Sequence, residues 1–248
     1  MNFNQNSYYL PLWFQGVKGF DPITTGVDFI PRLLPQLVAL VLAGAMVKRF
    51  GQYVPYMLIG ELIAIGGQVM LTQIRADSST LYWAASLVVS GIGTGIAMQL
   101  PYTAVAVTLS DKDIPVGNAV AVLFYQLGGA LFISVGQNIT ISTIIDLVPK
   151  ALPHLSSSRV IDGDATNLEA IATDAADLEV LRGIWNTAIT RTMILSAAIV
   201  GVSIPFTLGM EWLNAVKVAK DRAKASEFLE QEENGSPKTS KVVTKEEL

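Results

Sequence analysis

Apolar residues form long stretches along most of the chain, and short polar segments separate them. A bilayer core about 30 Å thick requires roughly 20 mostly apolar residues in a helix that rises about 1.5 Å per residue. Five stretches are long enough, and they cover residues 26–47, 55–74, 81–109, 116–148 and 184–210. The pattern therefore predicts an all-α protein, a polytopic bundle of transmembrane helices with five complete spans.

A further apolar stretch, residues 8–17, precedes the five spans. It is too short to cross a bilayer, and the polar residues in front of it lack the basic start of a secretory signal. We interpret it as the second half of a transmembrane helix, and we expect the chain to begin inside that helix.

The predicted spans are joined by short connections except at residues 149–183, which hold six acidic residues, three basic residues and His154. Apolar residues at helical spacing within this long loop predict one helix over residues 167–181. The loop is therefore expected to lie outside the membrane core, as an excursion from the bundle and not as a separate domain.

Charged residues dominate the chain after the last span. Residues 211–232 suit a surface helix, and residues 234–248 have the composition of a disordered end. We divide the chain into a transmembrane part, 1–217, and a charged tail, 218–248.

Basic residues near the span ends set the orientation of a membrane protein. One side receives Lys48, Arg49 and the bases that directly follow the last span, and the other receives Lys18, Arg75 and the bases of the long loop. The clustering on the first side favours a cytoplasmic tail and an extracellular long loop.

The composition supports a membrane protein. Only 15% of the residues are charged, against about 25% in soluble domains, and residues 211–248 hold 15 of those charges. The charged residues of the first 210 positions are too few to cover the surface of a soluble enzyme. A net charge of −4 argues against a nucleic-acid binder. With no cysteine and one histidine, the chain offers no thiolate or multi-histidine metal site. We expect no cofactor and no enzyme activity.

Polar residues inside the spans are the candidates for a solute path, because such residues usually face the bundle interior or a wet cavity. Gln99 and Pro101 follow a glycine-rich run that favours close helix packing, and they either line a path or interrupt the helix structurally. Gln126 and Asn138 fit either interhelical hydrogen bonds or contact with a solute. Gln15 follows a group of aromatic residues that suits either solute stacking or an interfacial belt.

Three ionisable residues enter the predicted spans. Asp28 precedes Arg32 by four residues, so we expect Arg32 either to pair with it on one helix face or to extend to the interface. Glu61 lies inside the cytoplasmic surface and either packs there or carries a proton. Arg191 lies near the start of the last span and is expected to extend to the interface.

Several strings occur together, namely residues 8–19 with Pro22 and Gly26, residues 91–105, residues 117–138, residues 185–188 and residues 210–212. They resemble the carboxyl half of fungal major facilitator transporters, in the drug:proton antiporter family with fourteen spans, whose members export toxins and drugs. The resemblance covers residues 8–217.

The resemblance implies the carboxyl-terminal half of a major facilitator fold and proton-coupled export of small amphipathic compounds. In that fold the first, second, fourth and fifth helices of a half lie toward the central cavity. Gln15, Gln99 and Gln126 are on such helices, whereas Glu61 is on an outer one. We expect the three glutamines to face the amino half.

Gly44, Arg49 and Gly51 resemble the second copy of a loop motif of the superfamily, the copy that occurs in the carboxyl half. In that motif an acidic residue precedes the arginine, and Lys48 stands in its place here.

No part of the chain resembles the amino half of these transporters. We therefore expect an incomplete transporter whose partners are the bilayer, a small solute and an amino-terminal half. The alternative is a non-transporting remnant, or a regulatory membrane protein that pairs with another transporter half. The resemblance favours the plasma membrane, with the vacuolar membrane as the alternative.

Overall fold

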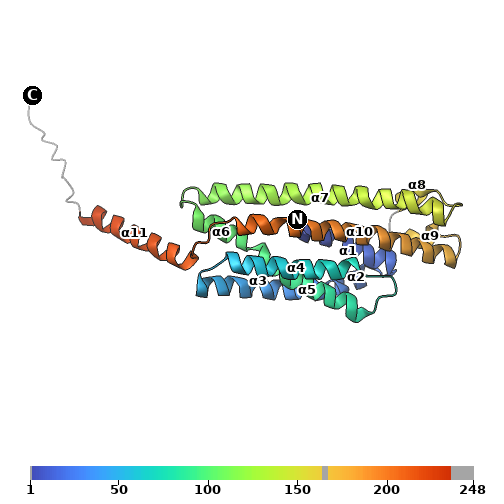
Figure 1. Ribbon diagram of the computed structural model, residues 1–248, viewed down its shortest axis with the longest axis horizontal. Coiled ribbons are helices and arrows are strands. Elements are labelled where there is room, and N and C mark those ends of the chain that lie inside the picture. The colour runs from blue at the N-terminus through green and yellow to red at the C-terminus, as the bar shows by residue number, and fades with distance from the viewer. Residues whose placement is uncertain (1, 164–166, 236–248) are drawn as a thin grey trace, which may run out of the picture.

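The computed structural model describes residues 2–163 and 167–235. In this part of the chain every regular element is a helix, and no strand forms. The long helices lie side by side along one axis, and the last helix leaves the bundle at one end (Figure 1). The predicted all-α transmembrane bundle is therefore confirmed.

Five segments of the described chain are long and apolar enough to cross a membrane, and each overlaps one predicted span. Three are single helices: α4 (Val54–Thr72), α7 (Ile114–Ala151) and α10 (Ala175–Leu208). The other two are composite: α2 (Pro22–Asp28) continues into α3 (Ile30–Phe50), and α5 (Thr80–Met98) continues into α6 (Leu100–Thr108).

Local chemistry explains where several of these helices begin and end. The carboxylate of Asp21 accepts the first free N–H groups of α2, and the hydroxyl of Ser79 does the same for α5. Helix α3 ends at Gly51, whose φ of 76° is a left-handed conformation that glycine adopts without strain.

The amino-terminal helix extends further than the apolar stretch at residues 8–17. Helix α1 (Asn2–Leu12) includes the polar residues before that stretch and continues into a π-helical turn, η1 (Trp13–Val17). Gln5 and Asn6 are buried on α1, because the helix packs between other helices instead of facing lipid.

Helix α5 is the centre of one side of the bundle and packs against both α3 and α4. A Cβ atom on Gly91 would overlap the backbone carbonyl of Arg32 on α3, and one on Gly93 would overlap the backbone of Ala64 on α4. Small residues permit such close approach in a bilayer. The close packing predicted for the glycine-rich run is therefore confirmed.

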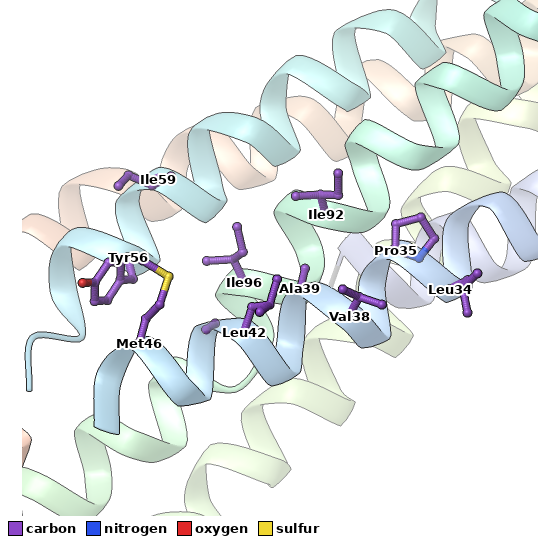
Figure 2. Close-up of a pocket in the computed structure, with 11 residues that line it drawn as sticks. Leu34, Pro35, Val38, Ala39, Leu42, Met46, Tyr56, Ile59, Ile92 and Ile96 are labelled. Carbon is purple, nitrogen blue, oxygen red and sulfur yellow. The ribbon is translucent and has the colours of Figure 1, made fainter. Parts of the chain in front are cut away.

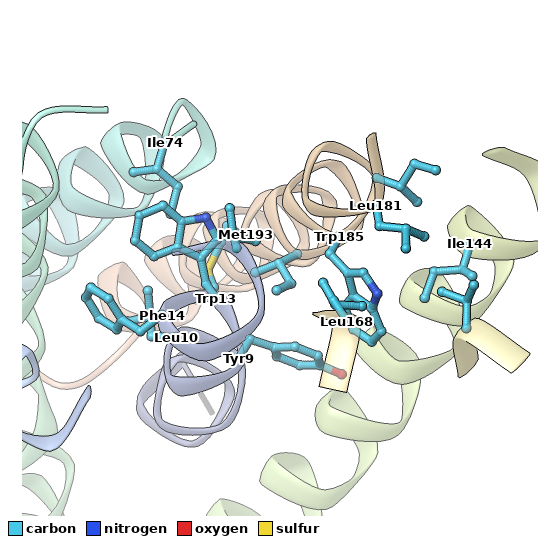
Figure 3. Close-up of a cluster of buried hydrophobic side chains, with 14 of the residues drawn as sticks. Tyr9, Leu10, Trp13, Phe14, Ile74, Ile144, Leu168, Leu181, Trp185 and Met193 are labelled. Carbon is cyan, nitrogen blue, oxygen red and sulfur yellow. The ribbon is translucent and has the colours of Figure 1, made fainter. Parts of the chain in front are cut away.

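The other side of the bundle is held by α10, which packs against α4 and α7, with α1 beside it. Figure 3 shows the buried cluster in this region, where Tyr9, Trp13 and Phe14 lie among side chains of the other helices. The indole N–H of Trp13 donates to the Asn186 side chain at 2.7 Å. The interfacial belt considered for Trp13 and Phe14 is therefore wrong, since both rings are buried in the core.

The long loop forms two short helices, α8 (Ser157–Asp162) and α9 (Leu168–Ile171). The single helix predicted over residues 167–181 is wrong, because the chain is extended before Asp174, whose carboxylate caps α10. Helix α10 thus begins nine residues before the predicted span at 184.

The charged tail begins with helix α11 (Ala215–Gly235), which agrees with the predicted surface helix. The guanidinium of Arg222 donates to the carbonyls of Ala106, Val107 and Leu109 at the end of α6. This contact attaches the tail to the bundle end that carries the α3–α4 and α6–α7 turns (Figure 1). The predicted disordered end lies, from residue 236 onward, outside the described residues.

Orientation can be measured directly, because the chain has no native cysteine. We expect Ser158→Cys, on α8, to react with an impermeant thiol reagent in intact cells. We expect Ser226→Cys, on α11, to react only after permeabilisation, because the basic residues next to α11 favour the cytoplasm. Labelling of Ser226→Cys in intact cells would reverse the orientation.

Close packing at Gly93 can be measured against a matched glycine. Gly93→Ala should lower the free energy of unfolding by about 1–3 kcal/mol, because the added methyl overlaps α4. Gly66→Ala on α4 is the control, since a Cβ there meets no atom within 4 Å. Thermal melts in detergent, followed by tryptophan fluorescence, compare the two. Equal melting temperatures would contradict the packing argument.

Candidate functional site

A cavity of about 270 Å³ lies among α1, α4, α5, α6, α7 and α10. Most of its walls are apolar, and the polar exceptions are Glu61, Thr94, Tyr125 and Ser203. Apolar walls with a few convergent polar groups are typical of a small-molecule site. We therefore take this cavity, the Glu61 cavity, as the candidate site.

Glu61 is the only acidic side chain among the described lining residues of this cavity, and it is 4% exposed. Its Oε1 accepts hydrogen bonds from the hydroxyls of Ser203, at 2.9 Å, and Thr207, at 2.8 Å. These hydroxyls are four residues apart on α10 and so share one helix face. Its Oε2 has no hydrogen-bond partner in the described structure.

The two carboxylate oxygens of Glu61 therefore differ. Oε1 is held by α10, and Oε2 is the oxygen that remains for a proton or a bound group. A buried carboxylate is costly when charged and incompletely bonded, and adding a proton removes the charge. In the described structure, one oxygen of Glu61 is thus anchored to α10 and the other is open to a further donor.

Pro101 is the predicted path residue that the structure brings together with Glu61. It is in the first turn of α6, and its ring lines the Glu61 cavity. Gln99 lies at the junction between α5 and α6, and its side chain is exposed. The predicted single span at 81–109 is thus divided at this junction, close to the cavity.

The remaining predicted path residues lie apart from the Glu61 cavity. Gln126 is exposed on α7, although its neighbour Tyr125 lines the cavity. Asn138 is also exposed, and its amide donates to the carbonyl of Ser134 in the same helix at 3.0 Å. Gln15 lines a different cavity, of about 310 Å³, with side chains of the long-loop end.

Gly44, Arg49 and Gly51 lie at or near the carboxyl end of α3. Gly44 has open space around it, and the Arg49 guanidinium lies 5.6 Å from the Phe50 ring. Gly51 ends the helix and contacts Asn214 at the start of the tail. Among the described residues Arg49 forms no ion pair.

A larger cavity, of about 470 Å³, lies between α3, α4 and α5 (Figure 2). Its walls are aliphatic side chains, and the Tyr56 hydroxyl is the polar group among them. It contains no acidic or basic side chain that could bind a proton or orient a charged solute. Size alone therefore does not make it the functional site.

Arg32 is the residue for which the sequence prediction failed. The expected pair with Asp28 is wrong: in the described structure, none of the guanidinium nitrogens of Arg32 has a hydrogen-bond partner. The guanidinium lies against the rings of Phe3 and Phe29. Arg32 is instead fully buried.

The sequence carried signals for two groups that the prediction missed. Arg32 and Gln36 are four residues apart, which places two polar side chains on one face of α3, and both are buried. Ser203 and Thr207 show the same spacing on α10. Their partner Glu61 is more than 140 residues away, so only the folded chain could identify it.

This architecture is that of a multi-pass membrane protein with a mostly apolar cavity, holding a few polar groups, between its helices. No family model matches the chain. The chain is 31% identical over 208 residues to the MFS-type transporter astH of Aspergillus oryzae, and 32% identical over 210 residues to the efflux pump roqT of Penicillium rubens. It is 30% identical over 203 residues to the MFS acetylaranotin efflux transporter ataA of Aspergillus terreus.

These alignments cover 82–85% of this chain and 37–45% of the relatives. The chain is thus a homologue of fungal major facilitator transporters and efflux pumps, and it spans less than half the length of these curated relatives. Within the described residues, no group of histidine, cysteine, aspartate and glutamate side chains could hold a metal ion.

Proposed function

We propose that the chain is one half of a major facilitator transporter that exports small amphipathic compounds, such as drugs, toxins and secondary metabolites, in exchange for protons. The observation that carries this proposal is the buried Glu61 in a mostly apolar cavity, in a chain whose relatives are named transporters and efflux pumps. An ionisable side chain at membrane depth is expensive and is usually functional.

Glu61 is the proposed proton site. It belongs to α4, and its Oε1 lies within hydrogen-bond distance of two hydroxyls of α10, those of Thr207 and of Ser203, the second of which also lies 2.7 Å from the Val200 carbonyl. Its charge therefore acts at the contact between two spans, and binding of a proton at Oε2 would neutralise the charge without breaking the bond from Thr207. Protonation therefore changes the electrostatics of the cavity, and a solute in the same cavity would experience the difference.

Gln99 and Gln126 are the proposed contacts of the solute path with an amino-terminal half. Both side chains are exposed, and several of the exposed residues near them, such as Met98 and Leu127, are large and apolar. A polar group left unsatisfied in lipid costs on the order of several kcal/mol, which favours a protein or a water-filled cavity on that face. Gln15 and Asn138 remain candidates for the same path, away from the Glu61 cavity.

The plasma membrane is the proposed location, with the vacuolar membrane as the alternative. Export across either membrane would remove an amphipathic compound from the cytoplasm, as the name efflux pump indicates for the relative roqT.

Glu61→Gln tests the proton site. The amide keeps the oxygen that accepts from Ser203 and Thr207, so the fold should persist while the proton site is lost. With an amino half co-expressed, we expect proton-driven dye uptake into inside-out vesicles, which corresponds to export from the cell, to fall to background.

Glu179→Gln is the matched control, since Glu179 is an exposed acid on α10. Its export should be unchanged. Full proton-driven export by the Glu61→Gln protein would place the proton site elsewhere.

Co-expression tests the need for a second half. In a transporter-depleted yeast we expect this chain alone to leave drug accumulation unchanged, because its polar face is then uncovered. Co-expression with the amino half of a relative such as roqT should lower accumulation. Export by a monodisperse monomer of this chain would contradict the proposal, and a stable complex without export would favour the regulatory alternative.

A further inference from the structure

Arg32 presents a permanent positive charge in the bundle interior. The side chain is 0% exposed, and its Nε, Nη1 and Nη2 have no hydrogen-bond partner in the described structure. A guanidinium carries five N–H donors and stays charged under all ordinary conditions. Burying such an ion without a counter-charge is strongly unfavourable.

The burial of Arg32 keeps its charged end from the membrane interface, which arginines usually reach. It follows the start of the predicted span at residue 26 by six residues, about 9 Å along the helix, and its side chain is 0% exposed. Arg191, in contrast, is exposed and donates to the Thr143 hydroxyl at 3.2 Å. Arg32 is therefore enclosed by the bundle.

Two aromatic rings are the contacts that the structure gives this guanidinium. Its Cζ lies 5.4 Å from the ring centre of Phe3 and 5.5 Å from that of Phe29. Such cation–π contacts offset only part of the cost of removing the charge from water. They leave the N–H donors, which lie in the guanidinium plane, without acceptors.

Phe3 connects Arg32 to the Glu61 cavity. Its ring contacts the guanidinium and also lines that cavity, together with Tyr125. A rotation of the Phe3 side chain would therefore open the cavity to the unpaired N–H donors of Arg32. The occupant of such a site combines an apolar or aromatic body with an anionic group.

We propose that Arg32 binds the anionic group of the solute, so that the transported class includes amphipathic organic anions and, in particular, aromatic carboxylates. A carboxylate matches the planar fork of a guanidinium and accepts two parallel N–H bonds. The inference rests on the proposed transport function, because it assigns a substrate class to the same cavity. An amino half could also supply the carboxylate, and the experiment separates the two sources.

The experiment measures binding of 2-naphthoate and 2-naphthamide to the full chain in lipid nanodiscs by equilibrium dialysis. The two probes share one ring system and differ in charge. We expect the naphthoate to bind at least about tenfold more tightly, since one charge-assisted pair is worth that much. Arg32→Gln should remove this preference, and Arg32→Lys should keep part of it.

Arg191→Gln is the control, because it neutralises an exposed arginine of another span and should leave the preference intact. Removal of an unpaired buried charge should also raise the melting temperature of Arg32→Gln, which shows that this variant folds. Equal affinity of the wild-type chain for both probes, or a preference that survives in Arg32→Gln, overturns the inference.

An amino half that raises the melting temperature of the wild-type chain, but not of Arg32→Gln, would identify a protein carboxylate as the partner and overturn the solute assignment. Export of a neutral dye by the co-expressed halves keeps the two proposals distinguishable. Neutral export without naphthoate preference defeats the anion inference alone, and absence of all export defeats the proposed function.

Discussion

The close approach of α5 to both α3 and α4 is the constraint on which the rest of the bundle depends. Apolar side chains gain little from each other in lipid, so helices associate through tight packing and hydrogen bonds. Gly91 and Gly93 remove the side chains that would hold the backbones apart, one on each side of α5. The same contacts fix the level of Arg32 on α3 and of Ala64, one turn from Glu61, on α4.

Two buried ionisable side chains of opposite sign lie within this packed unit, and their charged groups have different contacts. Glu61 has one oxygen bonded to hydroxyls of α10, whereas Arg32 contacts only aromatic rings through its charged group. Phe3 is close to both, because it lines the cavity of the first and covers the second. A charge without enough hydrogen-bond partners is costly in a membrane interior, and ionisable residues at such positions are usually functional. The proposals for this chain therefore rest on Glu61 and Arg32.

The outer surface of the bundle complements this interior. Most exposed side chains of the spans are large and apolar, as lipid requires, but Gln99 and Gln126 interrupt that surface. The interruption occurs near Pro101 and Tyr125, which line the Glu61 cavity from inside. Cavity and polar surface thus lie on two sides of the same helices, an arrangement suited to a solute path shared with a second half.

The sequence by itself determined the number of spans, the helical class and the tight packing of the glycine-rich run, because these follow from local length and residue size. It could not determine which charges would be paired. Asp28 and Arg32 have the spacing of a helical pair, but the guanidinium of Arg32 is buried against a ring from α1 instead. The partners of Glu61 lie on α10, far along the chain. Such contacts join residues that no local period relates, so only the tertiary structure could decide them.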